Sequence, residues 1–229
     1  HPRQSDLFAA ALLTGQITQI TDTAGPEGRP VVSPNGRYLA YTQTADVRQG
    51  YNGATLTIRD LTTSQSRSLT TDFHRSVSDI QWSQDSKSLW ISYTDLGMVR
   101  VAKIDLRGKL RQSDIVLGGT AIGRPYTSGS FSVGGKGRLA YTLGRDDRPA
   151  DVALMRPGKT PLKLTDLNGD LMGQRQMTRA ERITWPSSHD AMMIEGWVMK
   201  PPNFDPAKSY PMILEIHGGP HSAYGPNYS

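Results

Sequence analysis

The chain of 229 residues contains no cysteine, and this absence removes several kinds of chemistry. Without a thiol there is no disulfide, no zinc site built on thiolates and no cysteine nucleophile. The absence does not separate the cytoplasm from the periplasm, because proteins of neither compartment require cysteine.

Long apolar runs are also missing. A membrane-spanning helix needs about 18 or more consecutive apolar residues, whereas the apolar patch at 7–13 covers only seven. That patch lacks the basic leader and the cleavage site of a signal peptide, and His1 is not a typical first residue, which leaves a leader upstream open. We therefore expect a soluble protein, with the cytoplasm favoured and the periplasm as the alternative.

No block of charge of one sign occurs. The 26 basic and 21 acidic residues give a net charge of +5 but are interspersed along the chain. Because neither a basic stripe nor an aromatic RNA-binding motif accompanies this excess, we expect no nucleic-acid partner, and without long apolar runs no membrane partner.

What the chain does contain is turn residues and a repeat. Its 23 glycines and 15 prolines are typical of short strands joined by many turns. Ser33, Ser83 and Ser132 mark one recurring pattern, in steps of 50 and 49 residues. In each case an apolar strand, a tight turn and a strand rich in Tyr, Leu or Trp follow one another, at 31–42, 80–93 and 130–142.

A second half-pattern of two strands completes each unit. It is clearest at 55–61 and 66–70, and related segments occur at 104–110, 154–160 and, before the first unit, 12–21. Four antiparallel strands per unit, repeated in series, predict blades of a β-propeller. An irregular β-sandwich is the alternative, but it does not explain the constant spacing. We count half a blade and three blades, too few to close a ring.

The pattern changes near residue 167. We expect a polar linker or short helix over 170–180, then strands at 182–185 and 192–199 and a proline-rich loop. The apolar residues of 211–216 show little alternation and predict a strand buried on both faces. The sequence thus predicts a propeller domain over 1–178 and a second domain over 179–229.

A glycine-rich elbow follows that last strand. His217-Gly218-Gly219-Pro220 allows a sharp turn that leaves peptide N–H groups free to point at one spot. A loop of this kind after the third strand of an α/β-hydrolase sheet supplies half of an oxyanion hole. A simple strand-to-loop turn is the alternative. We expect His217 to brace the loop by hydrogen bonding more than to act as a base.

Three other patterns predict no site. His217 and His221 are four residues apart, but the Gly-Gly-Pro between them excludes a helical metal site. The segment 134–137 lacks the Gly-Lys-Ser/Thr of a phosphate loop. Asp146 and Asp147 are adjacent, so on a strand they would point to opposite sides, and we expect a solvated loop. No metal and no cofactor is therefore predicted.

The second domain resembles a known family. It is similar to the start of the hydrolase domain in acylaminoacyl-peptidase-like members of the prolyl oligopeptidase family. The segments that carry the resemblance are 195–197, 200–201, 204–206, 210–211 and 216–221, and those similar to that family's exit from its propeller are 149–152 and 164–168.

The resemblance implies a seven- or eight-bladed propeller that caps an α/β-hydrolase and admits short peptides to an enclosed active site. The implied reaction is acyl transfer to a serine through a Ser-Asp-His triad, followed by hydrolysis of the ester. It also implies that Gly219, with Gly218, donates backbone N–H groups to the oxyanion, and that His217 stands where relatives carry a tyrosine. Arg124 or Arg145 could meet a substrate carbonyl, and the sequence does not choose between them.

One departure limits this reading: the chain contains no Gly-x-Ser-x-Gly, and Gly129-Ser130 lacks the flanking spacing. The triad normally follows the elbow. We therefore expect a fragment that is inactive alone and whose partners are a short peptide substrate and the remainder of the same polypeptide, with a homo-oligomer left open. The alternative is a non-catalytic β-propeller module that binds a protein.

Overall fold

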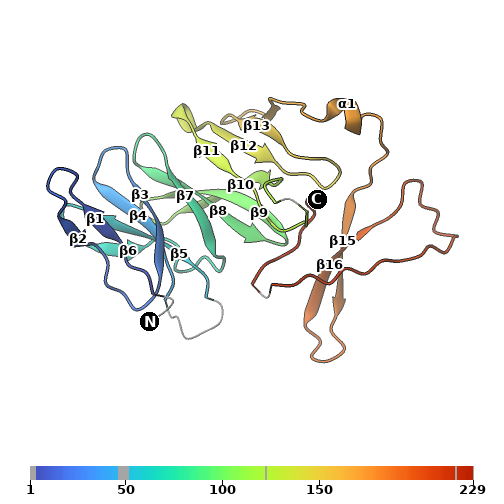
Figure 1. Ribbon diagram of the computed structural model, residues 1–229, viewed down its shortest axis with the longest axis horizontal. Helices are drawn as coiled ribbons and strands as arrows, with labels where there is room; N and C mark the ends of the chain where they lie inside the picture. The colour runs from blue at the N-terminus through green and yellow to red at the C-terminus, as the bar shows by residue number, and fades with distance from the viewer. Residues whose placement is uncertain (1–3, 46–51, 122, 220, 229) are drawn as a thin grey trace. The chain divides into compact units, whose positions relative to one another are not determined.

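A computed structural model describes residues 4–45, 52–121, 123–219 and 221–228 (Figure 1). Antiparallel strands and turns form nearly all of this part. The one α-helix found there, α1 (Gly169–Met172), has four residues, within a stretch expected to be a linker or short helix. Within the described ranges no helix has the length and apolar character needed to cross a bilayer.

The strands form the predicted half blade followed by three blades. The half blade is the hairpin of β1 (Phe8–Ala10) and β2 (Ile17–Gln19). The first whole blade runs in sequence order through β3 (Glu27–Val32), β4 (Tyr38–Gln43), β5 (Thr55–Asp60) and β6 (Ser66–Ser68).

The next two blades repeat this order. The second consists of β7 (Val77–Trp82), β8 (Ser88–Asp95), β9 (Met98–Asp105) and β10 (Leu110–Leu117). The third consists of β11 (Phe131–Val133), β12 (Leu139–Leu143), β13 (Asp151–Met155) and β14 (Leu162–Lys163), with the 3₁₀ turn Gly135–Gly137 before β12. A pair between Leu117 of β10 and Leu143 of β12 joins the second and third blades in one eight-stranded sheet. The predicted fold class, mainly β with a partial propeller, is confirmed.

The recurring turn between the first two strands of a blade explains the spacing. Gly36, Ser86 and Lys136, which are 50 residues apart, all adopt the left-handed backbone conformation, with φ of 72°, 58° and 58°. In the first blade the Ser33 hydroxyl accepts a hydrogen bond from the Tyr38 N–H at 2.9 Å. In the second, the Ser83 and Ser88 hydroxyls lie 2.8 Å apart. Two of the three marker serines, Ser33 and Ser83, therefore close their turns.

By its contacts, the described chain divides into two compact units. The first contains the residues up to Asp95 with Arg100–Ile115 and Ser132–Leu139, and the second contains Leu96–Val99, Val116–Phe131 and the residues from Ala140 onward. The predicted domain boundary between 178 and 179 is a different division, and it stays a prediction.

The core of the first unit is formed by side chains of the first blade and of the part of the second blade that belongs to this unit. Trp82 of β7 donates its indole N–H to the Val31 carbonyl of β3 at 2.9 Å, and its ring stacks on Tyr38, with centroids 6.2 Å apart. The fully buried side chains there include Leu56, Leu89 and Tyr93. The aromatic and leucine residues expected to pack between blades are buried or half-buried: Tyr38, Tyr41, Leu89, Trp90, Tyr93, Leu139 and Tyr141.

The second unit contains a long hairpin, β15 (Ala180–Pro186) and β16 (Met193–Met199), which confirms the strands expected at 182–185 and 192–199. Arg182 and Glu195 pair across it, with N···O distances of 2.8 and 3.1 Å. Trp197 packs on Gly97 so closely that a Cβ there would lie 2.4 Å from the indole ring. This contact ties the hairpin to the turn between β8 and β9.

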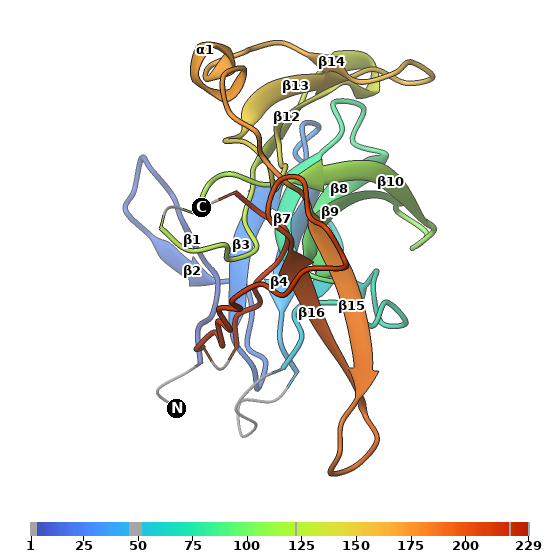
Figure 2. The same ribbon diagram turned by 90° about the vertical axis from the view of Figure 1, so that its right-hand side faces the viewer.

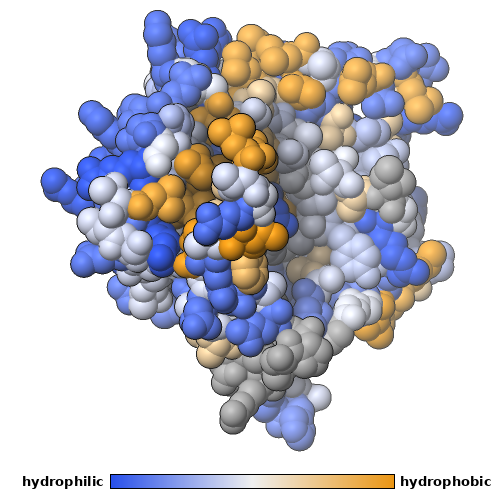
Figure 3. Space-filling view, turned by 60° about the vertical axis from the view of Figure 1, so that its left-hand side comes forward, coloured by the Kyte–Doolittle hydropathy of each residue, from blue (hydrophilic) through white to orange (hydrophobic). Residues whose placement is uncertain are grey.

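The strand expected at 211–216 is absent. In the described part of the chain these residues form no strand, and Met212, Ile213, Leu214 and Ile216 are 72–96% exposed. A strand requires hydrogen-bond partners for its backbone, and no described strand pairs with this segment. The prediction of a buried strand is therefore wrong for this structure. Figure 3 shows that hydrophobic side chains also reach the surface elsewhere, among many hydrophilic ones.

The adjacent aspartates also differ from expectation, because Asp146 and Asp147 are each only 8% exposed. Asp147 accepts two hydrogen bonds from Arg145, at 2.7 and 2.5 Å. Asp146 accepts one from Arg179 at 3.1 Å and one from the N–H of Ala180, the first residue of β15, at 2.6 Å. The prediction of a solvated loop is therefore wrong: both aspartates are buried, and Asp146 anchors the start of the hairpin.

We predict that Leu89→Ala lowers the free energy of unfolding by about 2–5 kcal/mol, because the removed atoms lose their burial and leave a cavity. Leu13→Ala is the matched control, since Leu13 is 101% exposed whereas Leu89 is 0% exposed, and we expect it to change stability by less than about 0.5 kcal/mol. Urea unfolding of the two variants measures both. Equal midpoints would show that Leu89 is not in the core.

A second prediction concerns pH. Burial by itself raises the pKa of Asp147, but the hydrogen bonds and charge of Arg145, together with the charges of Arg148 and Arg179, outweigh burial, so the net pKa lies below its usual value. A lowered folded-state pKa stabilises the fold above the unfolded-state pKa of about 3.9, and this contribution disappears as the pH falls through the folded-state pKa.

We therefore expect Asp147→Asn to destabilise the protein at pH 6, with the difference from the unmodified chain shrinking below about pH 4. Urea midpoints across this range measure it, and Asp72→Asn, at an exposed position, controls for the change in net charge. A difference that stays constant down to about pH 2 would contradict the ion-pair assignment.

Candidate functional site

The predicted oxyanion loop, residues 217–219, lies in a segment that runs beside the loop 124–127 of the second unit. The backbones meet at an antiparallel bridge between Tyr126 and Tyr224. The N–H of Thr127 donates to the Ala223 carbonyl at 3.0 Å, and the N–H of Gly225 donates to the Pro125 carbonyl at 3.0 Å. Figures 1 and 2 both show the red C-terminal segment next to the green loop that precedes β11.

Tyr224 is the centre of the side-chain contacts. Its ring stacks on the His217 imidazole, with centroids 4.9 Å apart and planes 26° apart. The edge-to-face partner on the other side is Tyr126, at 4.7 Å. Its hydroxyl donates to the Glu215 carboxylate at 3.1 Å and accepts from the Arg124 guanidinium at 3.1 Å. Tyr224 therefore contacts side chains of two segments that are distant in sequence, 124–126 and 215–217.

Arg124 and Glu215 also form an ion pair, with an N···O distance of 3.5 Å. The hydrogen bond to Tyr224, with the nearby negative charge of Glu215, raises the pKa of Arg124 above its already high value. Both side chains are exposed, 61% for Arg124 and 58% for Glu215, so the ion pair by itself contributes little. It is the shared tyrosine hydroxyl that gives the pair a defined geometry.

The two glycines of the oxyanion loop differ in their surroundings. A Cβ on Gly219 would lie 3.0 Å from the His221 nitrogen and 3.2 Å from that of Ser222, whereas one on Gly218 would meet nothing within 4 Å. The described residues of this loop take part in no β-ladder. Pro220, the last residue of the predicted elbow, lies outside the described residues. The assignment of these amides to an oxyanion stays a prediction.

His217 contacts both its own loop and Tyr224, and its role as a brace stays a prediction. Its Nδ1 lies 2.7 Å from the carbonyl oxygen of Gly218, and its ring is held against Tyr224. In the ranges that the structure describes, no group of three or more His, Asp or Glu side chains is placed to hold a metal ion.

The structure separates the two arginines between which the sequence did not choose. Arg145 binds Asp147 through two hydrogen bonds. Arg124 lies beside the oxyanion loop through Tyr224. No local sequence pattern indicates Tyr224, Glu215 or Tyr126, because the pairing of Arg124 with Tyr224 spans 100 residues.

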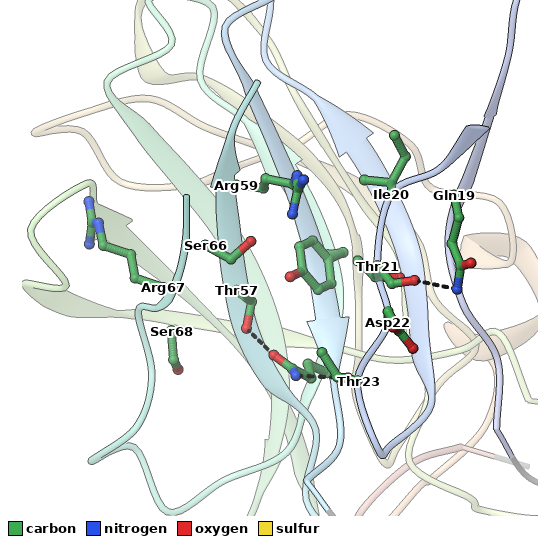
Figure 4. A pocket seen from close by; sticks show the side chains of 12 residues that line it. Gln19, Ile20, Thr21, Asp22, Thr23, Thr57, Arg59, Ser66, Arg67 and Ser68 are labelled. Atoms are coloured by element: carbon green, nitrogen blue, oxygen red, sulfur yellow. Dashed lines mark hydrogen bonds between the residues drawn. The ribbon is translucent and has the colours of Figure 1, made fainter. Parts of the chain in front are cut away.

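A polar cavity of about 660 Å³ lies in the first unit, between β2 and the face of the first whole blade. Figure 4 shows hydroxyl and amide side chains around it, some of which bond to one another: Thr57 donates to Gln43 at 3.0 Å, and Gln43 to Thr23 at 3.1 Å. Its lining contains one carboxylate, Asp22, and no histidine.

Comparison with known proteins gives relatives among peptidases, although no family model matches the chain. Dipeptidyl-peptidase 5 of Aspergillus fumigatus is 28% identical over 219 residues, which cover 90% of this chain and 28% of that protein. Dipeptidyl-peptidase 5 of Porphyromonas gingivalis is 27% identical over 222 residues, 95% of this chain and 31% of that protein. The chain thus spans less than a third of the length of these relatives.

Among solved structures, the acylaminoacyl peptidase of Pyrococcus horikoshii in its orthorhombic crystal form is similar with a TM-score of 0.72 at 20% sequence identity. The match covers 94% of this chain and 31% of that one. At this identity the likeness shows the fold. The sequence relatives and this fold agree with the resemblance: the chain is similar in sequence to dipeptidyl-peptidase 5 and in fold to an acylaminoacyl peptidase.

Proposed function

We propose that this chain supplies part of the propeller and the oxyanion loop of a serine peptidase that hydrolyses short peptides through an acyl-enzyme. The propeller segment is 1–178 and the start of the α/β-hydrolase domain is 179–229. The serine, the aspartate and the histidine of the triad belong, in this proposal, to further residues of the same polypeptide.

The observation that carries the proposal is the state of the loop 217–219. It follows the order of segments typical of the family, it takes part in no β-ladder in the described structure, and His217 and Tyr224 hold it against a propeller loop. Oxyanion donors work by being fixed before the charge develops. A braced loop whose amides are not used for strand pairing meets that requirement.

In the proposed mechanism a serine attacks the carbonyl carbon of the scissile peptide bond while a histidine takes its proton. Negative charge then develops on the carbonyl oxygen, and the N–H groups of Gly219 and Gly218 stabilise it. Collapse of the intermediate expels the amine, which receives the proton from the histidine, and water hydrolyses the ester. His217 contributes by bracing the loop.

The substrate class is proposed from the relatives, which are named as dipeptidyl and acylaminoacyl peptidases. Both names describe action near the end of a peptide. We therefore propose a short peptide as substrate, with the removal of dipeptides and of acylated residues as the two activities to compare in the full-length protein.

A non-catalytic protein-binding propeller is the second candidate. The exposed apolar residues 212–216 favour it, because Ile213 is 96% and Ile216 82% exposed, and such residues can form an interface. A fluorophosphonate probe on the full-length, folded protein separates the two candidates. The peptidase takes one covalent label, the present 229-residue chain takes none, and failure of the intact full-length protein to react excludes the peptidase.

Substitution at the two glycines tests the assignment of the oxyanion donor. We expect Gly219→Ala to lower kcat of the full-length enzyme by about 100- to 1,000-fold, the typical effect of losing one donor, because the new Cβ forces the backbone away from the nitrogens of His221 and Ser222. KM should change little, since the interaction is made mainly in the transition state.

Gly218→Ala is the matched control, because its Cβ would enter open space and leave both N–H groups in place. We expect less than about a tenfold loss, within the range of a small displacement of the catalytic geometry. If Gly219→Ala retains kcat within about threefold of the unmodified enzyme, the 219 amide is not the donor.

A further inference from the structure

We propose that Arg124 and Tyr224 are positioning residues, which hold the oxyanion loop through His217 and thereby make its geometry depend on the loop 124–127. This inference rests on the proposed function for its catalytic consequence. Its structural part, a clamp on residues 217–219, stands on the contacts alone.

The hydroxyl of Tyr224 fits its two partners without conflict. A phenol has one proton to donate and lone pairs to accept. Glu215, as a carboxylate, only accepts, and Arg124 only donates, at 3.1 Å in each case. Both hydrogen bonds involve a charged partner and are therefore stronger than a bond between neutral groups.

The ring of Tyr224, held in place by the hydrogen bonds of its hydroxyl, in turn restricts the position of the oxyanion loop. Its face stacks on His217, and the Nδ1 of that histidine lies 2.7 Å from the Gly218 carbonyl oxygen. Any shift of Tyr224 therefore moves the residue that precedes Gly218. An aromatic pair of this kind prefers the offset or edge arrangements observed here, which restrict the ring more than simple apolar contact does.

Backbone contacts fix the position of Tyr224 itself. The bridge with Tyr126 and the hydrogen bonds of Ala223 and Gly225 hold the residues on either side. Gly225 lies against Gly97 so closely that a Cβ on Gly225 would lie 1.7 Å from the Gly97 carbonyl oxygen. By contrast, residues 211–216 have no strand partner in the described chain. The Tyr224 contacts therefore constrain the loop from its C-terminal side.

The test compares three variants. Tyr224→Phe keeps the stacked ring and removes the hydroxyl, Arg124→Met removes the donor and keeps much of the side chain, and Arg124→Lys restores a positive donor. Arg156→Met is the control, because Arg156 is an exposed arginine after β13 with no ion pair among the described residues.

The first readout is NMR of the 229-residue chain and does not depend on activity. We expect Tyr224→Phe and Arg124→Met to lower the order parameters of the Gly218 and Gly219 amides, toward values below about 0.6, and to change the ring-current shifts of the His217 protons. Arg124→Lys should restore them in part, and Arg156→Met should leave them unchanged.

The second readout is steady-state kinetics of the full-length protein. We expect a loss of about tenfold in kcat with KM within about threefold for each of the two disruptive variants. The double variant should be no worse than the more damaging single one, because both act on the same contact. If Arg124 and Tyr224 had only a structural role, their variants would lower the stability of the protein without a loss of kcat at nearly unchanged KM.

The outcomes separate this inference from the proposed function. If the order parameters and the His217 shifts do not change in either disruptive variant, the clamp is overturned even where the enzyme is active. If they change but the full-length protein takes no fluorophosphonate label, the clamp stands and the peptidase proposal fails.

Discussion

The requirement that every backbone N–H and C=O find a partner determines most of this structure. Inside a blade each strand pairs with its neighbour in sequence, so four short strands and three turns satisfy one another locally. The same requirement explains why one apolar segment forms no strand. Residues 211–216 are as apolar as a core strand, yet no described strand offers them a ladder, and their side chains stay exposed.

The regular part could be predicted from the sequence because its causes are local. The tight turn at Gly36, Ser86 and Lys136 needs a left-handed residue, and the serine three residues before Gly36 and Ser86 closes the turn through its hydroxyl. These features lie within a few residues of one another and return every 50 residues, so spacing alone reveals the blade. The hairpin of β15 and β16 was predictable for the same reason.

The remainder could not be predicted because its causes are long-range. Asp146 is buried by Arg179 and Ala180, more than 30 residues away, and nothing beside Asp146 in the sequence indicates this. The contact of Arg124 with Tyr224 joins residues 100 positions apart. For 211–216 the composition shows a segment suited to burial but not whether a partner strand is present. The composition of a segment therefore predicts that its side chains need burial and its backbone a partner strand, and the tertiary structure decides whether both are present.

The site combines both kinds of information, since a motif recognisable from the sequence is held by contacts that only the structure shows. The sequence singles out His217 and the two glycines, whose role stays a prediction, whereas it does not indicate the tyrosine that contacts His217. The most direct measurement of the central claim is a crystal structure of the full-length protein with a covalent phosphonate on its serine. The account predicts that the Gly219 nitrogen lies about 2.7–3.1 Å from the phosphonyl oxygen. A distance beyond about 4 Å, with the N–H directed away from that oxygen, would contradict it.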